Sequence, residues 1–167
     1  VGAKNGPNAV RSQLANIPFL LTANIHDKGD IAPVQEQIDD AQFKLAKQVH
    51  TSLGQGHFPI VIGGGHEVAR GSFLGLHQWS QSSNPSARIG IINLDAHLDL
   101  RAPAPNTSSG TPFFQINELL RANNQPFQYA CVGVSDTANT PALFERAAQL
   151  GVKCIYDTEF SDLTIEK

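Results

Sequence analysis

The regular alternation of short apolar runs with segments of helical period constrains the fold of this chain more than any other feature. The apolar runs, which predict strands, cover residues 59–62, 88–94, 128–134 and 152–156. The helical patterns cover residues 6–16, 33–54, 68–79, 113–123 and 141–150. Such alternation is typical of an α/β fold with a doubly wound, mostly parallel sheet, which binds ligands at the carboxyl ends of its strands. The run at 88–94 is apolar nearly throughout, which predicts a strand buried on both faces.

Composition narrows the class of partner. The chain has 167 residues, 41% of them hydrophobic, with 12 Lys and Arg against 15 Asp and Glu, which suits one folded domain over residues 1–167. A net charge of -3 and the lack of any basic cluster exclude nucleic acid and anionic membranes as principal partners. The longest apolar run falls far short of the roughly 20 residues of a membrane span, and we expect a cytoplasmic protein. Cys131 and Cys154 lack CxxC spacing and are expected to be free thiols in strands.

The densest group of polar residues is Asn93-Leu-Asp-Ala-His-Leu-Asp99. Asp95, His97 and Asp99 recur at every second position after an apolar strand, so an extended backbone would bring them to one face. Buried charges are usually paired or coordinate metals, which favours a metal site. The alternative is a polar strand end in a metal-free domain.

A second group, Gly63-Gly-Gly-His66-Glu67, follows the predicted strand at 59–62 and offers His66 as a fourth ligand at the same sheet edge. The glycines could instead bind phosphate, but the sequence has neither a Walker loop nor GxGxxG spacing. A zinc-protease helix is excluded because Arg70 stands where the second His is required. His and Asp donors without thiolates favour Mn²⁺, with Zn²⁺, Fe²⁺ and Co²⁺ as alternatives, and two such ions sharing a water would favour hydrolysis.

Together these two motifs resemble the first two signatures of the ureohydrolase superfamily of arginases, agmatinases and formimidoylglutamases. The resemblance implies a three-layer α/β/α sandwich, two manganese ions per complete subunit, a homo-oligomer and hydrolysis of a C–N bond in a small guanidino or amidino compound. Residues 93–101, 107–113 and 139–146 are most similar to the formimidoylglutamases. That similarity implies that N-formimidoyl-L-glutamate and water give L-glutamate and formamide, in histidine catabolism, through a hydroxide bridging the two ions.

The resemblance also implies a role for each metal ligand. His66 and Asp99 correspond to ligands of one manganese, His97 to a ligand of the other, and Asp95 to a bridge between them. The superfamily's last two ligands come from an Asp-x-Asp motif on a later strand, and no such motif follows Asp99.

The end of the sequence agrees with a missing segment. Ser161 resembles a helix N-cap, yet only one turn follows it. We therefore expect the natural chain to continue past Lys167, with the second metal motif in the C-terminal strands and helices that are missing here.

Residues 101–113 bear on the substrate. Phe113 stands where arginases carry a His, which disfavours an arginase. Arg101 is predicted to hold a substrate carboxylate, with Ser109 and Thr111 as lesser donors, although Arg101 could also be a solvated loop charge. Two alternatives remain: an agmatinase or guanidino-acid hydrolase that releases urea, and a catalytically inactive metal-binding fragment.

Overall fold

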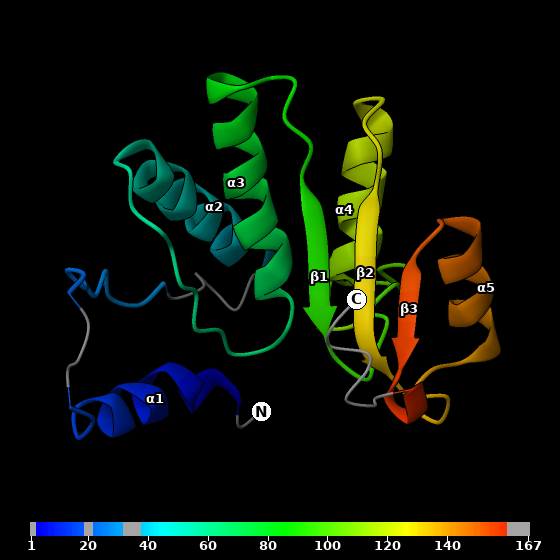
Figure 1. Cartoon of the computed structure of the whole chain (residues 1–167), viewed down its shortest axis with the longest axis horizontal. Helices are drawn as coiled ribbons and strands as arrows, with labels where there is room; N and C mark the ends of the chain where they lie inside the picture. Colours follow the sequence, from blue (N-terminus) through cyan, green and yellow to red (C-terminus); the bar gives the residue numbers. More distant parts are fainter. Residues whose placement is uncertain (1–2, 19–21, 32–37, 160–167) are drawn as a thin grey trace.

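The computed structural model describes residues 3–18, 22–31 and 38–159 (Figure 1). Its elements, in chain order, are η1 (Ala3–Asn5), α1 (Gly6–Leu14), α2 (Ile38–Gly54), α3 (Val68–Ser83), β1 (Gly90–Leu94), α4 (Pro112–Ala122), β2 (Gln128–Val134), α5 (Pro141–Gln149), β3 (Lys153–Tyr156) and η2 (Asp157–Glu159). From α3 onward, the predicted elements agree with these bounds to within a few residues. The predicted starts of the helix at Pro33 and of the helix at Ser161 lie outside the described residues.

The three strands form one parallel sheet in the order β1-β2-β3. Ile92 pairs with Ala130, and Cys131 pairs with Cys154. Because all three strands run the same way, their carboxyl ends meet at one edge of the sheet (Figure 1). The parallel α/β architecture predicted from the alternation is confirmed.

Helices α2 and α3 pack closely against each other beside β1 (Figure 1). Gly75 permits this approach, since a Cβ there would overlap the Ala46 carbonyl oxygen and lie 2.7 Å from the Val49 Cβ. Phe73 of α3 joins the main core cluster with side chains of α4, β2 and α5. Cys131 lies in the same core and Cys154 packs against it, and both are free, as expected.

Two expectations about the strands are wrong. Residues 59–62 form no strand, because no neighbouring strand among the described residues pairs with them, and Ile60 is 80% exposed. The strand β1 is buried on one face only: Asn93 is buried, whereas Ile92 and Leu94 are 76% and 80% exposed. Within the described part of the chain, nothing covers that second face.

In the described ranges, no helix is both long and apolar enough to cross a membrane.

Candidate metal centre

The candidate ligands after β1 lie on a loop, not on a strand. The strand β1 ends at Leu94, and Asp99 has a φ of 46°, in the left-handed region that residues other than glycine rarely adopt. The expectation of an extended backbone through Asp99 is therefore wrong. Strained backbone of this kind persists only where the surrounding structure fixes it, and it is common at functional sites.

From His97 to Leu100, buried side chains still alternate with more exposed ones. Leu98 and Leu100 are fully buried in the core, whereas Asp95 and Asp99 lie at the surface of the sheet edge as partly exposed side chains. Burial of two leucines fixes the loop, since each contributes about 1.5–3 kcal/mol by leaving water. We call residues 95–101 the metal loop below.

Hydrogen bonds from β1, β2, α4, α5 and the connection between β2 and α5 fix the backbone of the metal loop. Each carbonyl oxygen from residue 95 to residue 100 has a donor: the Cys131 thiol for Asp95, the Asn139 amide and the Ser135 N–H for Ala96, the Asn93 amide for His97, the Tyr129 hydroxyl for Leu98, the Phe113 N–H for Asp99 and the Arg146 guanidinium for Leu100. Because every carbonyl is held, the loop is a rigid platform for its side chains.

His66 comes from the glycine turn that leads into α3. A Cβ at Gly63 would lie 2.6 Å from a methyl carbon of the β-branched Val68, so this tight turn favours glycine at that position, whereas a Cβ at Gly65 would meet only the flexible Glu67 carboxylate. The buried Gln42 side chain of α2 donates a hydrogen bond of 2.9 Å to the Glu67 carbonyl and so ties the turn to α2.

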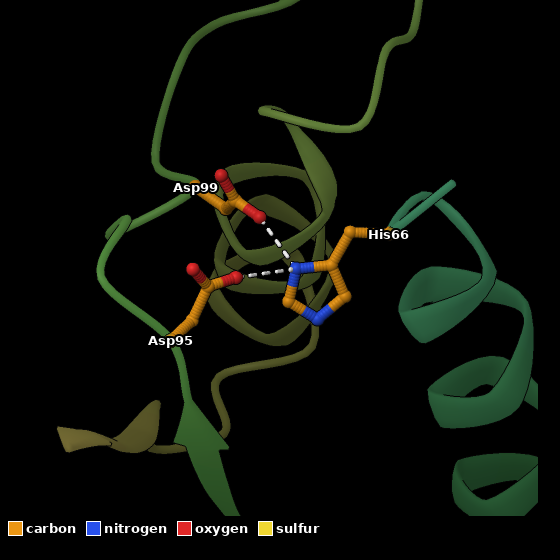
Figure 2. A group of neighbouring side chains, drawn as sticks. All are labelled: His66, Asp95 and Asp99. Atoms are coloured by element: carbon orange, nitrogen blue, oxygen red, sulfur yellow. Dashed lines mark hydrogen bonds and ion pairs between the residues drawn. The ribbon is translucent and has the colours of Figure 1, made fainter. Parts of the chain in front are cut away.

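Figure 2 shows His66, Asp95 and Asp99 pointing toward one another. The His66 Nδ1 atom lies 2.6 Å from Asp99 Oδ2 and 3.2 Å from Asp95 Oδ2. One donor atom from each of the three residues lies within 4.8 Å of the others. The hydrogen bond with Asp99 raises the pKa of the His66 imidazole, aided by the charges of Asp99, Asp95 and Glu67, while burial opposes this shift.

His97 is the sequence-predicted ligand that the structure does not bring into this group. Its side chain is 56% exposed, and its Nδ1 atom lies 3.2 Å from Asp95 Oδ1. The His97 backbone N–H also donates to Asp95 Oδ1, at 3.0 Å. His97 is thus adjacent to the three-residue group, through Asp95, and not part of it.

A cavity of about 320 Å³ opens at this site, in the size range of small-molecule sites. Its walls are formed by His66, Asp95, His97, Asp99, Arg101, Ser108, Ser109, Gly110, Ala138, Asn139 and Leu143. Two of the three predicted substrate donors, Arg101 and Ser109, are therefore in the wall.

Thr111, the third predicted donor, does not line the cavity. It is 2% exposed, and its hydroxyl accepts a hydrogen bond from the Ser108 N–H and contacts the Ser108 carbonyl and the Gln115 side chain. Its hydroxyl therefore stabilises the loop that carries Ser108 and Ser109.

The aromatic residue that disfavours an arginase also contacts the site. The Phe113 ring meets the His66 ring edge-on at 5.4 Å and stacks on Tyr129 at 4.5 Å. This packing limits rotation of the imidazole and covers one side of it.

The donor set fits a divalent metal ion. One imidazole nitrogen and two carboxylates converge without a thiolate, which suits Mn²⁺ and similar borderline-hard cations. The Nδ1 atom of His66 contacts both carboxylates. A cation bound among these three side chains would balance the negative charge of the two carboxylates. Sequence reasoning missed the residues that support this group, chiefly Gln42, Tyr129 and Asn139, because hydrogen bonds to backbone carbonyls leave no spacing pattern in a sequence.

Comparison with known proteins finds curated relatives over nearly the whole chain. The formimidoylglutamases of Aeromonas salmonicida and Hahella chejuensis are each 48% identical to the chain, over 99% and 95% of its length. The matched residues cover 52% and 48% of those two proteins, so the chain spans about half the length of the curated relatives it matches.

Solved structures show the same fold. A crystal structure of Trypanosoma cruzi formiminoglutamase with Mn²⁺ matches 95% of this chain and 54% of its own, with a TM-score of 0.80 and 26% identity. Arginase from Bacillus subtilis matches with a TM-score of 0.73 at 22% identity, over 95% of this chain and 58% of its own. The arginase-like α/β fold implied by the sequence motifs is confirmed. The arginase family model matches residues 1–167, and the chain therefore belongs to the arginase family.

Proposed function

We propose that this chain binds manganese through His66, Asp95 and Asp99 and forms part of the active site of an amidine hydrolase. The observation that carries the proposal is the convergence of these three donors within 4.8 Å at the wall of a cavity. His97 offers a further donor next to Asp95, for a second ion. Curated relatives named formimidoylglutamase and a related structure with Mn²⁺ support both the metal and the reaction.

The proposed substrate is N-formimidoyl-L-glutamate, which water converts to L-glutamate and formamide, a step of histidine degradation. Bound metal would supply a Lewis acid and a water of lowered pKa near the formimidoyl carbon. The chain's own contribution is to orient the substrate. Arg101 forms no ion pair among the described residues, so its guanidinium can bind a substrate carboxylate through paired hydrogen bonds.

Neighbouring residues set the position of Arg101. The Arg101 N–H donates to the Gly110 carbonyl at 2.9 Å, which closes the loop on itself. A Cβ at Gly110 would lie 3.2 Å from the Arg101 Cδ, so glycine leaves room for the arginine stem beside the cavity. Ser109, on the same loop, supplies a hydroxyl in the cavity wall as a second donor.

Titration of the chain with Mn²⁺ in a calorimeter tests the metal site. Asp99→Asn should weaken binding by more than the roughly 10–100-fold typical of residues that only support a ligand. Asp136→Asn, which changes an exposed carboxylate outside the cavity wall, is the matched control and should bind Mn²⁺ as the unsubstituted chain does. A chain that binds no Mn²⁺ would refute the proposal.

Product analysis tests the reaction. The manganese-loaded chain is incubated with N-formimidoyl-L-glutamate, and separately with agmatine and guanidino acids, and formamide and urea are measured. Formamide release with two bound ions supports the proposed hydrolase, whereas urea release would favour the agmatinase alternative. Metal binding without turnover would identify the chain as a metal-binding portion of such a site, in agreement with its coverage of about half of its relatives.

A further inference from the structure

The segment at the start of α5 holds the metal loop from the side opposite His66. Asn139 precedes α5 and Arg146 lies within it, and both side chains bond to the backbone of the metal loop. We propose that Asn139 is a positioning residue for the metal ligands Asp95 and Asp99, with Arg146 fixing the far end of the same loop. The inference rests on the proposed metal site.

Where the sheet ends, the Asn139 side chain makes backbone hydrogen bonds of the kind that a neighbouring strand makes within the sheet. The ladder between β1 and β2 continues for one step, as the Asp95 N–H donates to the Val132 carbonyl and the Ser135 N–H donates to the Ala96 carbonyl. Beyond this point the metal loop leaves the sheet. The Asn139 amide then accepts from the Leu98 N–H at 3.0 Å and donates to the Ala96 carbonyl at 2.8 Å.

A carboxamide carries both an acceptor and a donor, so the Asn139 side chain satisfies the Leu98 N–H and the Ala96 carbonyl together. The same Asn139 nitrogen also donates to the Ser135 carbonyl at 3.0 Å, so one side chain joins the ends of two neighbouring strands. Leu98 is fully buried, and its N–H would lose its acceptor if Asn139 were removed. An unsatisfied buried donor is costly, and the loop would move to avoid it.

Arg146 fixes the other end of the loop. Its guanidinium donates to the Leu100 carbonyl at 2.5 Å and lies 5.0 Å from the centre of the Phe114 ring on α4. Asp99 thus lies between two held points, the Leu98 N–H and the Leu100 carbonyl. This explains how the left-handed backbone at Asp99 is maintained, with its carboxylate 2.6 Å from His66.

The position of both carboxylates therefore depends on Asn139, although Asn139 itself is not among the three converging donors. If the loop is free to move, binding a metal ion must first order it, and affinity falls. Substitution of residues that orient metal ligands typically costs 10–100-fold in metal affinity.

The experiment compares the chain with its Asn139→Leu and Asn139→Asp variants by two measurements. Amide hydrogen exchange is followed without metal, and Mn²⁺ affinity is measured by calorimetry. Asn139→Leu should speed exchange at Leu98 about 10-fold or more, because the Leu98 N–H loses the acceptor it has among the described residues, and should weaken Mn²⁺ binding about 10–100-fold. Asn139→Asp keeps an acceptor for the Leu98 N–H and should restore much of the protection at Leu98.

Asn117→Asp is the matched control for loss of stability. Asn117 is a buried asparagine of α4 whose amide bonds to Glu118 and, among the described residues, makes no hydrogen bond to the metal loop. The new carboxylate next to Glu118 should lower the urea midpoint without changing exchange at Leu98 or Mn²⁺ affinity. A change in Mn²⁺ affinity with this control would assign the effect to stability and overturn the positioning role.

The two measurements also separate this inference from the proposed function. Mn²⁺ affinity within about 2-fold of the unsubstituted chain in Asn139→Leu would overturn the inference and leave the metal site intact. If the unsubstituted chain binds no Mn²⁺, the proposed function fails, and the metal-positioning role of Asn139 fails with it. Unchanged exchange at Leu98 in Asn139→Leu would overturn the inference whether or not Mn²⁺ binds.

Discussion

Tyr129→Phe tests how strongly the core supports the metal loop. The Tyr129 side chain is 4% exposed, and its hydroxyl donates to the Leu98 carbonyl and accepts from the Asn93 amide, both at 3.1 Å. The substitution keeps the ring and its stacking on Phe113, and removes only the hydroxyl. The change therefore isolates two hydrogen bonds in the core.

The expected loss of stability follows from those bonds. Among the described residues the Leu98 carbonyl has no other donor, so it would be left buried and unsatisfied, while the Asn93 amide keeps weaker contacts with the His97 carbonyl and the Cys131 sulfur. An unsatisfied buried group costs about 1–3 kcal/mol. We expect the free energy of unfolding at pH 7 to fall by that amount, measured by urea denaturation.

The difference between the two chains should shrink at alkaline pH. Burial, followed by the nearby Cys131 thiol, raises the pKa of Tyr129 far above its ordinary value, against a smaller opposing effect of the hydrogen bond from Asn93. Since the folded-state pKa is raised, the stabilisation is complete below the unfolded pKa of about 10 and is lost as the pH rises above it. At pH 11 this effect lowers the free energy of unfolding of the unsubstituted chain by about 1.4 kcal/mol, and it is absent in the phenylalanine variant.

Tyr156→Phe is the control, because no hydrogen bond of the Tyr156 hydroxyl is found among the described residues and its ring stacks on Phe144. It should cost less at pH 7 than Tyr129→Phe. A Tyr129→Phe chain as stable as the original at pH 7, or a stability difference that does not narrow between pH 9 and pH 11, would refute the reasoning.

Gly75→Ala should destabilise the chain by about 1–3 kcal/mol, because overlap with the Ala46 carbonyl outweighs a gain of about 1 kcal/mol in helix propensity. Gly54→Ala, where a Cβ meets nothing within 4 Å, should be neutral or stabilising in the same thermal unfolding assay; equal effects of the two would contradict this account. Arg101→Ala should weaken binding of N-formimidoyl-L-glutamate to the manganese-loaded chain about 10-fold or more, measured by calorimetry. Arg88→Ala changes an arginine outside the cavity at the candidate metal centre and should leave substrate binding unchanged. If Arg101→Ala also leaves the affinity unchanged, Arg101 does not bind the substrate carboxylate.

Most of the architecture was predictable from local patterns. The strand at 128–134 and the helix start at Pro141 are fixed by an apolar run and by proline at the first helical turn. The strand expected at 59–62 failed for a different reason. A strand needs a neighbour with which to pair, and an apolar run carries no information about whether one is present.

The candidate site was found in the sequence by a partly incorrect argument. His97 and Asp99 do alternate with buried residues, but the alternation comes from Leu98 and Leu100 anchoring a loop, and not from an extended strand. His97 consequently lies outside the converging group.

The sequence by itself determined the parallel α/β class, the donor types and the two segments that carry them, because periodicity and residue chemistry are local properties. Only the tertiary structure decided which donors meet. His66 and Asp99 are 33 residues apart in the chain and lie 2.6 Å apart in space, at a distance set by contacts among several elements. The Asn139 amide, the Tyr129 hydroxyl and the Gln42 amide hold the two segments in place through backbone groups that every residue possesses. Such contacts depend on where the chain brings its parts together, and no spacing along the sequence records them.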